Sequence, residues 1–462
     1  MRYIINSYYL MIGYRDHPYC LSNLYSGDTF FFDSKEYEMI QRCNGTDDID
    51  PQSFEPKEKE LFDRLLQNYL IRPSNDNETL SDYQKYKLYP NNYKNDVQLS
   101  ITGHCNCRCR HCFVSAPHAK YDELSFNDCV HILDELAGCG VRKIGLTGGE
   151  PLIHPGFKQI IEEISKRRLI LSTLYTNGLI LSDEILQLLK TYNQSPDIQI
   201  SFDGLGTHEW LRGIKGIQNT VIDSIRRSVK HGFFTHISMV LYKDNLNSIL
   251  ENIRFLDSLG VKSIKISPIE NLGEWQAYAK DHGISHEQAY EEYLRIIPEL
   301  LQNKPQARIE LGGFFIYDPS KDLITSSYEK RCSSRNQDHY YLCKSLKQSF
   351  YINSNGILYP CATMMNDENN NQFNILKRPL EEIFDDEQFN FIAGKTAADY
   401  FNENKKCSEC EYKYLCAGGC RAKALLDGNS LMGIDEQTCA YFKDGWKEKK
   451  DKLLSSLLGD HD

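Results

Sequence analysis

One short cysteine-rich segment constrains this chain more than any other feature. Cys105, Cys109 and Cys112 form a C-x3-C-x2-C triplet just after the apolar run 97–101. Three thiolates on one loop can bind three irons of a cubane [4Fe–4S] cluster and leave the fourth iron without a protein ligand. Ferredoxin motifs, in contrast, supply a full set of ligands. An open iron lets a small molecule chelate the cluster and accept an electron from it.

Two other interpretations of the triplet stay open at this point. A zinc ion would need a fourth ligand, which His104 or His111 offers. The cysteines can also be buried thiols without a metal. Because closely spaced thiolates suit iron and zinc, the spacing favours a metal site, with iron–sulfur as the leading interpretation. Cys107, in the same loop, is expected to point away from the ligands.

Length, charge and cysteine content limit the class of protein. A chain of 462 residues is expected to form two or three domains. No apolar run reaches the roughly 18 residues of a membrane span, and residues 1–9 lack a signal-peptide pattern. We therefore expect a cytoplasmic protein, in which 16 cysteines indicate metal or redox chemistry rather than disulfides. A net charge of −11 argues against a nucleic-acid partner.

Residues 1–73 are predicted to form a small domain of their own. Three strand-like runs are followed by a helix that a capping box opens at Asp33–Glu36 and that stops at Gly45, and then by a second helix. The strands are placed at Tyr8–Tyr14, Cys20–Tyr25 and Thr29–Phe32, and the second helix at Pro56–Tyr69. This order suggests a winged-helix-like unit. Twelve acidic against eight basic residues make DNA binding an unlikely role for it. Residues 74–95 are polar and are interpreted as a linker.

From residue 96 to 275 the chain alternates strand and helix about six times. Such alternation predicts parallel strands with helices packed outside. The expected fold is α/β, a partial (β/α)6 barrel, with a doubly wound sheet as the alternative. The strands are placed at Val97–Thr102, Arg142–Thr147, Leu169–Tyr175, Asp197–Phe202, His236–Tyr242 and Lys262–Ser267. A bridging region, 276–330, is expected to contain a helix at Ser285–Leu301 and a strand at Arg308–Tyr317.

Unusual residues follow the predicted strands, at the edge where barrel active sites form. The cysteine loop follows the first strand, Gly148, Gly149 and Glu150 the second, and Asn177 the third. Ser201 and Asp203 lie where the fourth strand closes, and Arg212 follows them. Glycines let the backbone approach a ligand closely, and Glu150 can accept hydrogen bonds from a cationic amino group. Together these residues predict a ligand site on one rim.

With these motifs the chain resembles the radical S-adenosylmethionine (SAM) superfamily. The resemblance implies that the methionine part of SAM chelates the open iron, and that reductive cleavage yields a 5′-deoxyadenosyl radical. It also implies that Gly148, Gly149 and Glu150 bind the amino group of SAM. Ser201 and Asp203 would bind its ribose or carboxylate, while Arg212 pairs with the carboxylate and Asn177 lies near the SAM.

The C-terminal third, residues 331–445, carries a second set of cysteines, and a helical tail, 446–462, follows it. By spacing alone the Cys407–Cys420 run also fits a zinc ribbon. The full pattern resembles the SPASM domain of radical SAM enzymes, which binds two auxiliary [4Fe–4S] clusters. The resemblance implies Cys343, Cys361 and Cys420 as ligands of the first cluster, with Cys332 as its candidate fourth ligand. It implies Cys407, Cys410, Cys416 and Cys439 as ligands of the second.

The resemblance predicts a radical SAM maturase that oxidatively modifies a ribosomally made precursor peptide, by a thioether or carbon–carbon cross-link. The N-terminal domain would bind the peptide, and a flavodoxin or ferredoxin would supply electrons, with no nucleic acid or membrane involved. Alternatives are a sulfatase-maturase-like enzyme, a peptide epimerase and a non-catalytic iron–sulfur electron carrier. The sulfatase-maturase type has an Asp directly after the cysteine that Cys361 matches, and here that residue is Ala362.

Overall fold

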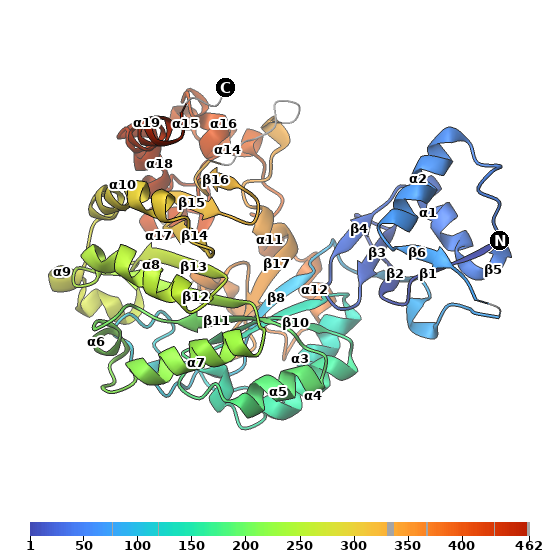
Figure 1. The fold of residues 1–462 in the computed structure, drawn as a ribbon, viewed down its shortest axis with the longest axis horizontal. Coiled ribbons are helices and arrows are strands. Elements are labelled where there is room, and N and C mark those ends of the chain that lie inside the picture. The colour runs from blue at the N-terminus through green and yellow to red at the C-terminus, as the bar shows by residue number, and fades with distance from the viewer. Residues whose placement is uncertain (76, 119, 330–336, 366–367, 429, 460–462) are drawn as a thin grey trace.

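The computed structural model describes residues 1–75, 77–118, 120–329, 337–365, 368–428 and 430–459. This part of the chain contains three β-sheets. Two small sheets belong to an N-terminal domain that stands beside a larger body (Figure 1). The larger body contains the third sheet, its covering helices and the C-terminal helices.

The N-terminal domain is built from short strands and two helices. Its sheets have the orders β5-β1-β6 and β4-β3-β2-β7. The Asp33 side chain accepts a hydrogen bond from the Glu36 amide and opens α1, as predicted. The elements are β1 Arg2–Ile5, β2 Tyr9–Tyr14, β3 Cys20–Asn23, β4 Thr29–Phe31, α1 Ser34–Arg42, β5 Asn44–Asp48, α2 Pro56–Gln67, β6 Ile71–Pro73 and β7 Lys87–Tyr89. β1, β5 and β6 were not predicted, and β5 begins where α1 was expected to continue.

The segment interpreted as a linker contributes to this domain. Its strand β7 pairs in parallel with β2, joining Leu88 to Gly13 and Tyr89 to Tyr14. The Gln84 side chain donates a hydrogen bond to the Tyr9 carbonyl. Tyr89 is buried because it packs against Tyr14, and this tertiary contact holds a polar segment that has no strand pattern of its own.

One large sheet forms the centre of the body. Within the described residues it has eleven strands in the order β16-β15-β14-β13-β12-β11-β10-β9-β8-β17-β18. From β8 to β14 all neighbours are parallel, so the six predicted barrel strands, β8 to β13, are confirmed, and β14 adds a seventh parallel strand. These strands are β8 Asp96–Ser100, β9 Lys143–Thr147, β10 Ile170–Thr176, β11 Asp197–Ser201, β12 Thr235–Leu241, β13 Ser263–Pro268 and β14 Arg308–Leu311.

Helices cover the outer face of this sheet (Figure 1). In β12, alternate residues are fully buried and face the helices, while those between them, such as His236 and Ser238, are half-buried and face the barrel interior. The covering helices are α3 Phe126–Gly138, α4 Phe157–Lys166, α5 Asp183–Thr191, α7 Gln218–Lys230, α8 Ile249–Ser258 and α10 His286–Asn303, while the short helices α6 His208–Arg212 and α9 Ala279–His282 pack in a separate apolar cluster. Cys129 of α3 is buried in this core, on the same helix face as Ile132 and Leu133.

Both edges of the sheet differ from the predicted pattern. The single strand expected at Arg308–Tyr317 is wrong, because Gly312 and Gly313 take left-handed conformations and turn the chain back. β14 and β15, Phe315–Asp318, are therefore antiparallel, and β16, Leu323–Thr325, continues the meander. At the other edge β17, Ser349–Ile352, pairs in parallel with β8, and β18, Leu358–Tyr359, pairs antiparallel with β17 as a hairpin.

The C-terminal cysteines lie on and between the helices of the last part of the chain. The helices are α11 Lys344–Gln348, α12 Leu380–Asp385, α13 Glu387–Asn390, α14 Ala397–Glu403, α15 Lys405–Ser408, α16 Lys413–Cys416, α17 Arg421–Gly428, α18 Glu436–Lys443 and α19 Trp446–Leu458. Arg15 of the N-terminal domain pairs with Asp385 and Glu381 of this region. No described helix is long and apolar enough to cross a membrane.

Candidate functional site

A cavity of about 250 Å³ opens where β8, β9, β10 and β11 end. Parallel strands bring their carboxyl ends to one rim, so residues far apart in sequence meet there. Eight of the predicted site residues line this cavity: Cys105, Cys109, Cys112, Gly148, Gly149, Asn177, Ser201 and Arg212. Two others, Glu150 and Asp203, lie behind its wall and are not among the lining residues.

The two glycines let the loop after β9 lie directly on the cysteine loop. A Cβ atom on Gly148 would come within 2.4 Å of the Thr102 carbonyl oxygen, and one on Gly149 within 2.0 Å of the His104 carbonyl oxygen. The Gly149 amide donates to the Thr102 carbonyl at 2.7 Å. Side chains at these positions would push the two loops apart. The glycines thus allow the two loops to pack against each other.

Glu150 is fully buried and bonds to the protein itself. Its carboxylate accepts hydrogen bonds from the Thr176 hydroxyl at 2.8 Å and from the Asn177 amide at 2.7 Å. Burial raises the pKa of Glu150 to about 7, and these donors offset part of that effect. The carboxylate therefore positions the end of β10, which carries Asn177 into the cavity.

Asp203 and Arg212 form a buried bidentate pair. The Nε of Arg212 lies 2.6 Å from Asp203 Oδ2, and its Nη2 lies 3.2 Å from Oδ1. Burial alone would raise the pKa of Asp203, but the Arg212 charge holds it well below its usual range. The remaining Nη1 of Arg212 lies 3.7 Å from Cys109 Sγ. Asp203 thus anchors the guanidinium, and Arg212 presents its free edge to the cavity.

The cysteine loop places hydrogen-bond donors on its sulfurs. The Cys107 amide lies 3.3 Å from Cys105 Sγ, and the Ala116 amide 3.2 Å from Cys112 Sγ. A hydrogen bond from the Cys107 thiol lowers the pKa of Cys109 to about 6, with a contribution from the Arg212 guanidinium. Burial raises the pKa of Cys112 to about 12, so metal binding there must displace a proton. Three sulfurs on one cavity wall with donors aimed at them fit a cluster ligand set.

The structure shows where the other three candidate residues of this loop lie. Cys107 was expected to point away, yet it lines the same cavity. His111, considered as a zinc ligand, also lines it, and burial lowers its pKa to about 3, which keeps the ring neutral. His104 is exposed and is not among the lining residues. Among the described residues, no three His, Cys, Asp or Glu side chains are grouped as ligands of one metal ion.

The sequence interpretation missed some residues that line the cavity. Tyr175 of β10 and Gln199 of β11 are neighbours in register and face the barrel interior. The Tyr175 ring occupies the space above Gly145, where a Cβ would lie 3.1 Å from it, and its hydroxyl accepts a hydrogen bond from Gln98. Strand alternation was the available signal, because Tyr175 and Gln199 lie two residues before Asn177 and Ser201, and side chains two residues apart on a strand face the same side.

Comparison with known families agrees with this geometry. The family model described as "Radical SAM superfamily" matches residues 99–256, which begin in β8 and end in α8. The chain belongs to the radical SAM superfamily. A second model, described as "Iron-sulfur cluster-binding domain" and named SPASM, matches residues 343–411. The protein is therefore a radical SAM enzyme with a SPASM domain, and both domains imply SAM and iron–sulfur clusters as cofactors.

Relatives and solved structures extend the likeness beyond these domains. This radical SAM enzyme is 26% identical to the subtilosin biosynthesis protein AlbA of Bacillus subtilis, over 77% of this chain and 73% of AlbA. It is 25% identical to the AdoMet-dependent heme synthase of Methanosarcina barkeri, over 75% of this chain and 96% of that protein. Streptococcus suis SuiB, solved with bound S-adenosylmethionine, has the same fold with a TM-score of 0.65. That match has 17% identity and covers 94% of this chain and 99% of SuiB.

The SPASM cysteines of this radical SAM enzyme fall into two sets in space. Cys407, Cys410, Cys416 and Cys439, the four cysteines predicted to act together, line one cavity. Cys343 and Cys361 pack on one apolar cluster. Burial raises the pKa of Cys361, and the neighbouring thiols of Cys420 and Cys343 add to this shift. The first set is thus also brought together. Its candidate fourth ligand, Cys332, lies outside the described residues.

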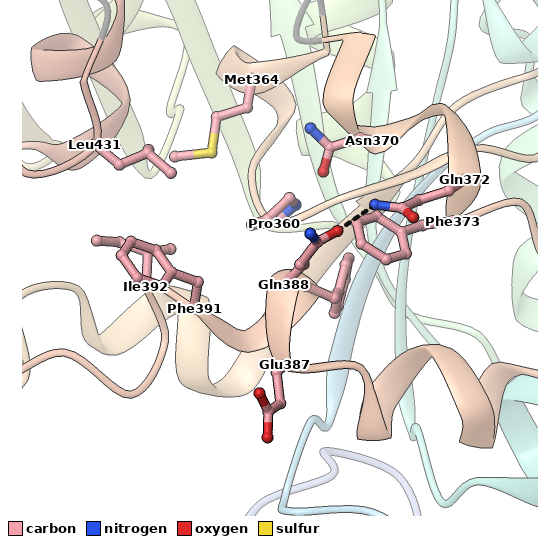
Figure 2. Close-up of a pocket in the computed structure, with 11 residues that line it drawn as sticks. Pro360, Met364, Asn370, Gln372, Phe373, Glu387, Gln388, Phe391, Ile392 and Leu431 are labelled. Atoms are coloured by element: carbon pink, nitrogen blue, oxygen red, sulfur yellow. Dashed lines mark hydrogen bonds between the residues drawn. The ribbon is translucent and has the colours of Figure 1, made fainter.

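A separate cavity of about 740 Å³ lies beside the first SPASM set (Figure 2). Pro360, which precedes Cys361, and Met364, which follows it by three residues, belong to its wall. Gln372 donates a hydrogen bond to Gln388 across one side of it, at 2.6 Å. None of the predicted cluster ligands is among its lining residues, so this cavity is distinct from both cysteine sites.

Proposed function

We propose that this radical SAM enzyme is a maturase that oxidatively cross-links a ribosomally made precursor peptide, through a thioether or a carbon–carbon bond. The observation that carries the proposal is a separate N-terminal domain with an open edge strand, β4, on a chain that also holds the SAM-type cavity and two further cysteine sets. Likeness to AlbA, a bacteriocin biosynthesis protein, supports a peptide substrate, as does the SuiB structure with its precursor peptide SuiA.

The proposal assigns three [4Fe–4S] clusters, one at the barrel rim and two in the SPASM domain. When bound, the rim cluster and SAM supply the 5′-deoxyadenosyl radical. Gly148, Gly149, Asn177 and Ser201 would bind SAM, and Arg212, held by Asp203, would pair with its carboxylate. Removing one hydrogen atom from the peptide leaves a substrate radical. Forming the new bond then releases a further electron and a proton, and the two auxiliary clusters can accept the electron.

Electrons for SAM cleavage would come from a flavodoxin or ferredoxin, in a cytoplasmic protein without nucleic-acid or membrane partners. The sulfatase-maturase type has less support, because Ala362 follows Cys361 and offers no carboxylate as a base. Peptide epimerisation is a second candidate. Cys107 favours it, because its thiol lines the SAM-type cavity and can act as a hydrogen donor to a substrate radical.

Co-expression with the short open reading frames encoded beside it, followed by tandem mass spectrometry, tests the proposal. A product lighter by two hydrogens, in which the joined residues resist fragmentation, is the expected result. An unchanged mass with one solvent deuterium at a backbone α-carbon would establish epimerisation instead. Peptides that are never altered by an enzyme still able to cleave SAM would refute a peptide substrate.

Replacing Cys105, Cys109 and Cys112 together by Ala tests the assignment of the rim cluster. We expect 5′-deoxyadenosine formation with dithionite to stop, while about eight of about twelve irons remain, since each cubane holds four. Iron analysis and chromatography of the nucleoside measure both. Cys20→Ala, which removes a buried thiol of the N-terminal domain, is the control and should keep SAM cleavage. Anaerobically reconstituted protein that holds only zinc would contradict the assignment.

A further inference from the structure

The SPASM domain contains a buried arginine without a carboxylate partner. Arg421, the first residue of α17, is 1% exposed. Its Nη1 donates to the carbonyls of Leu431 at 3.0 Å and Gly433 at 2.9 Å. Its Nε and Nη2 are buried and have no hydrogen-bond partner among the described residues, so no described carboxylate is bonded to them. A buried cation left in this way is costly unless a negative group balances it.

Tyr400 connects this arginine to the cysteines. The guanidinium carbon of Arg421 lies 4.7 Å from the centre of the Tyr400 ring. The Tyr400 hydroxyl lies 3.5 Å from Cys407 Sγ and 3.2 Å from the Gly433 carbonyl. Tyr400 is fully buried, lines the cavity of the second cysteine set and packs in the apolar cluster that includes Cys343 and Cys361. The ring with its arginine therefore packs against the second cysteine set, and its apolar cluster extends to Cys343 and Cys361 of the first set.

The unpartnered side of the guanidinium faces the wall of the second cysteine cavity. Gly418, which lines that cavity, has φ +78, and a Cβ atom on it would lie 3.0 Å from Arg421 Nη2 and 3.0 Å from the Tyr400 ring. The nearby carboxylate of Asp435 is engaged elsewhere, with the Cys420 amide and Thr438. The free N–H groups of Arg421 are thus packed behind the cysteines, separated from the cavity by one glycine.

We propose that Arg421, supported by Tyr400, is the positive charge that balances the iron–sulfur cluster bound by Cys407, Cys410, Cys416 and Cys439, and that it raises the reduction potential of this cluster. The proposal rests on the auxiliary cluster of the proposed function. Four thiolates make such a cluster anionic, and adding one electron makes it more so. A cation fixed in a low-dielectric interior stabilises the reduced form more than the oxidised form, and cluster potentials respond to local charge.

A redox titration of the auxiliary clusters tests this role without relying on turnover. The parent protein carries Cys105, Cys109 and Cys112 as Ala, so that only auxiliary clusters contribute to the electron paramagnetic resonance signal. In it, Arg421→Gln keeps donors for the two carbonyls but removes the charge, and Arg421→Lys keeps the charge. Arg378→Met, which removes an arginine that Asp386 already pairs, is the matched control.

We expect Arg421→Gln to lower the midpoint potential of one of the two signals, and Arg421→Lys and Arg378→Met to leave both near the parent values. Equal potentials in the parent and Arg421→Gln proteins, at equal iron content, would overturn the proposal. If only Arg421→Gln loses iron, the charge is needed for the cluster and the proposal holds. If Arg421→Lys and Arg421→Gln both lose iron, Arg421 acts through its shape rather than its charge, and the proposal fails. A parent protein without auxiliary iron would instead refute the proposed cluster assignment.

Discussion

Two buried carboxylates beside the rim cavity show how single partners decide a charge. Asp203 and Glu150 are both fully buried. Asp203 has the Arg212 guanidinium at 2.6 Å and a pKa well below its usual range, while Glu150 has only neutral donors and a pKa raised to about 7. Neutral hydrogen bonds do not offset the cost of burying a charge in the way that a cation does.

Glu150 should make folding stability fall as the pH rises. Between about pH 4.5, where the unfolded residue titrates, and about pH 7, the folded protein holds a proton that the unfolded chain has lost. The contribution of Glu150 to the free energy of unfolding therefore decreases by about 1.4 kcal/mol per pH unit in that window. Urea denaturation of the metal-free protein and of Glu150→Gln at pH 5, 6 and 7 measures it. The free energy of unfolding of the wild type minus that of Glu150→Gln should decrease as the pH rises, and a constant difference would contradict the shift.

At the scale of elements, β4 offers an open edge for an incoming strand. It pairs with β3 alone among the described strands, and Phe30 and Phe31 are 38% and 46% exposed. Backbone bonds join Asn23 to Asp28 and Phe32 to Tyr19. Antiparallel pairs alternate, so Phe30 bonds inward to β3, while the N–H groups of Thr29 and Phe31 face outward. An extended leader peptide can pair with these groups by strand addition.

Comparing two replacements of Phe31 tests strand addition. Phe31→Pro removes both the ring and the outward N–H, whereas Phe31→Ala removes only the ring. Ordering the leader costs roughly 2–5 kcal/mol, so we expect the unchanged protein to bind the precursor peptide with micromolar affinity. Because the Pro variant also lacks the backbone N–H, it should bind at least about tenfold more weakly than the Ala variant. Fluorescence anisotropy of labelled peptide measures this. Equal binding by the two variants would exclude pairing at this edge.

At the scale of the whole molecule, few polar contacts attach the N-terminal domain to the body. The Tyr14 hydroxyl donates a hydrogen bond to the Gly140 carbonyl, and Arg15 forms an ion pair with Asp385. The Nζ of Lys143 lies 3.7 Å from Asp28 Oδ1. Strand β7 belongs to this domain although it follows the segment expected to end it. The natural cut between the two parts therefore lies after β7, near residue 90, rather than at residue 73.

A chain that begins at residue 91 should keep SAM cleavage and lose peptide modification. The rim cavity contains no residue of the N-terminal domain, so deoxyadenosine formation should stay within about twofold of the full chain. Modification of the precursor should fall at least about tenfold, because leader binding is lost. A chain that begins at residue 74 is the comparison, and exposure of the unpaired β7 should make it less soluble. Wild-type modification by the chain from 91, or equal turnover of a leaderless peptide by the full chain, would contradict a leader-binding role.

The sequence by itself determined the barrel strands and the residues of the rim. Alternating apolar runs of limited length specify parallel strands locally, and cysteines, glycines and polar residues directly after them must then share one edge. The burial of a thiol such as Cys129 can also be predicted from the sequence, because apolar residues three and four positions apart define the buried face of its helix. These features depend on residues that are close together in the chain, so the local sequence pattern predicts them.

Only the tertiary structure decided which side chains at the rim face the cavity and which support it from behind. Glu150 and Asp203 are as polar as Ser201, yet contacts with Thr176 and Arg212 turn them into the wall. The pairing of β17 with β8, and the packing of Arg421 on Tyr400, likewise join segments whose local sequence does not specify a partner. Which groups meet after folding depends on contacts across the whole chain, and burial then sets their charge.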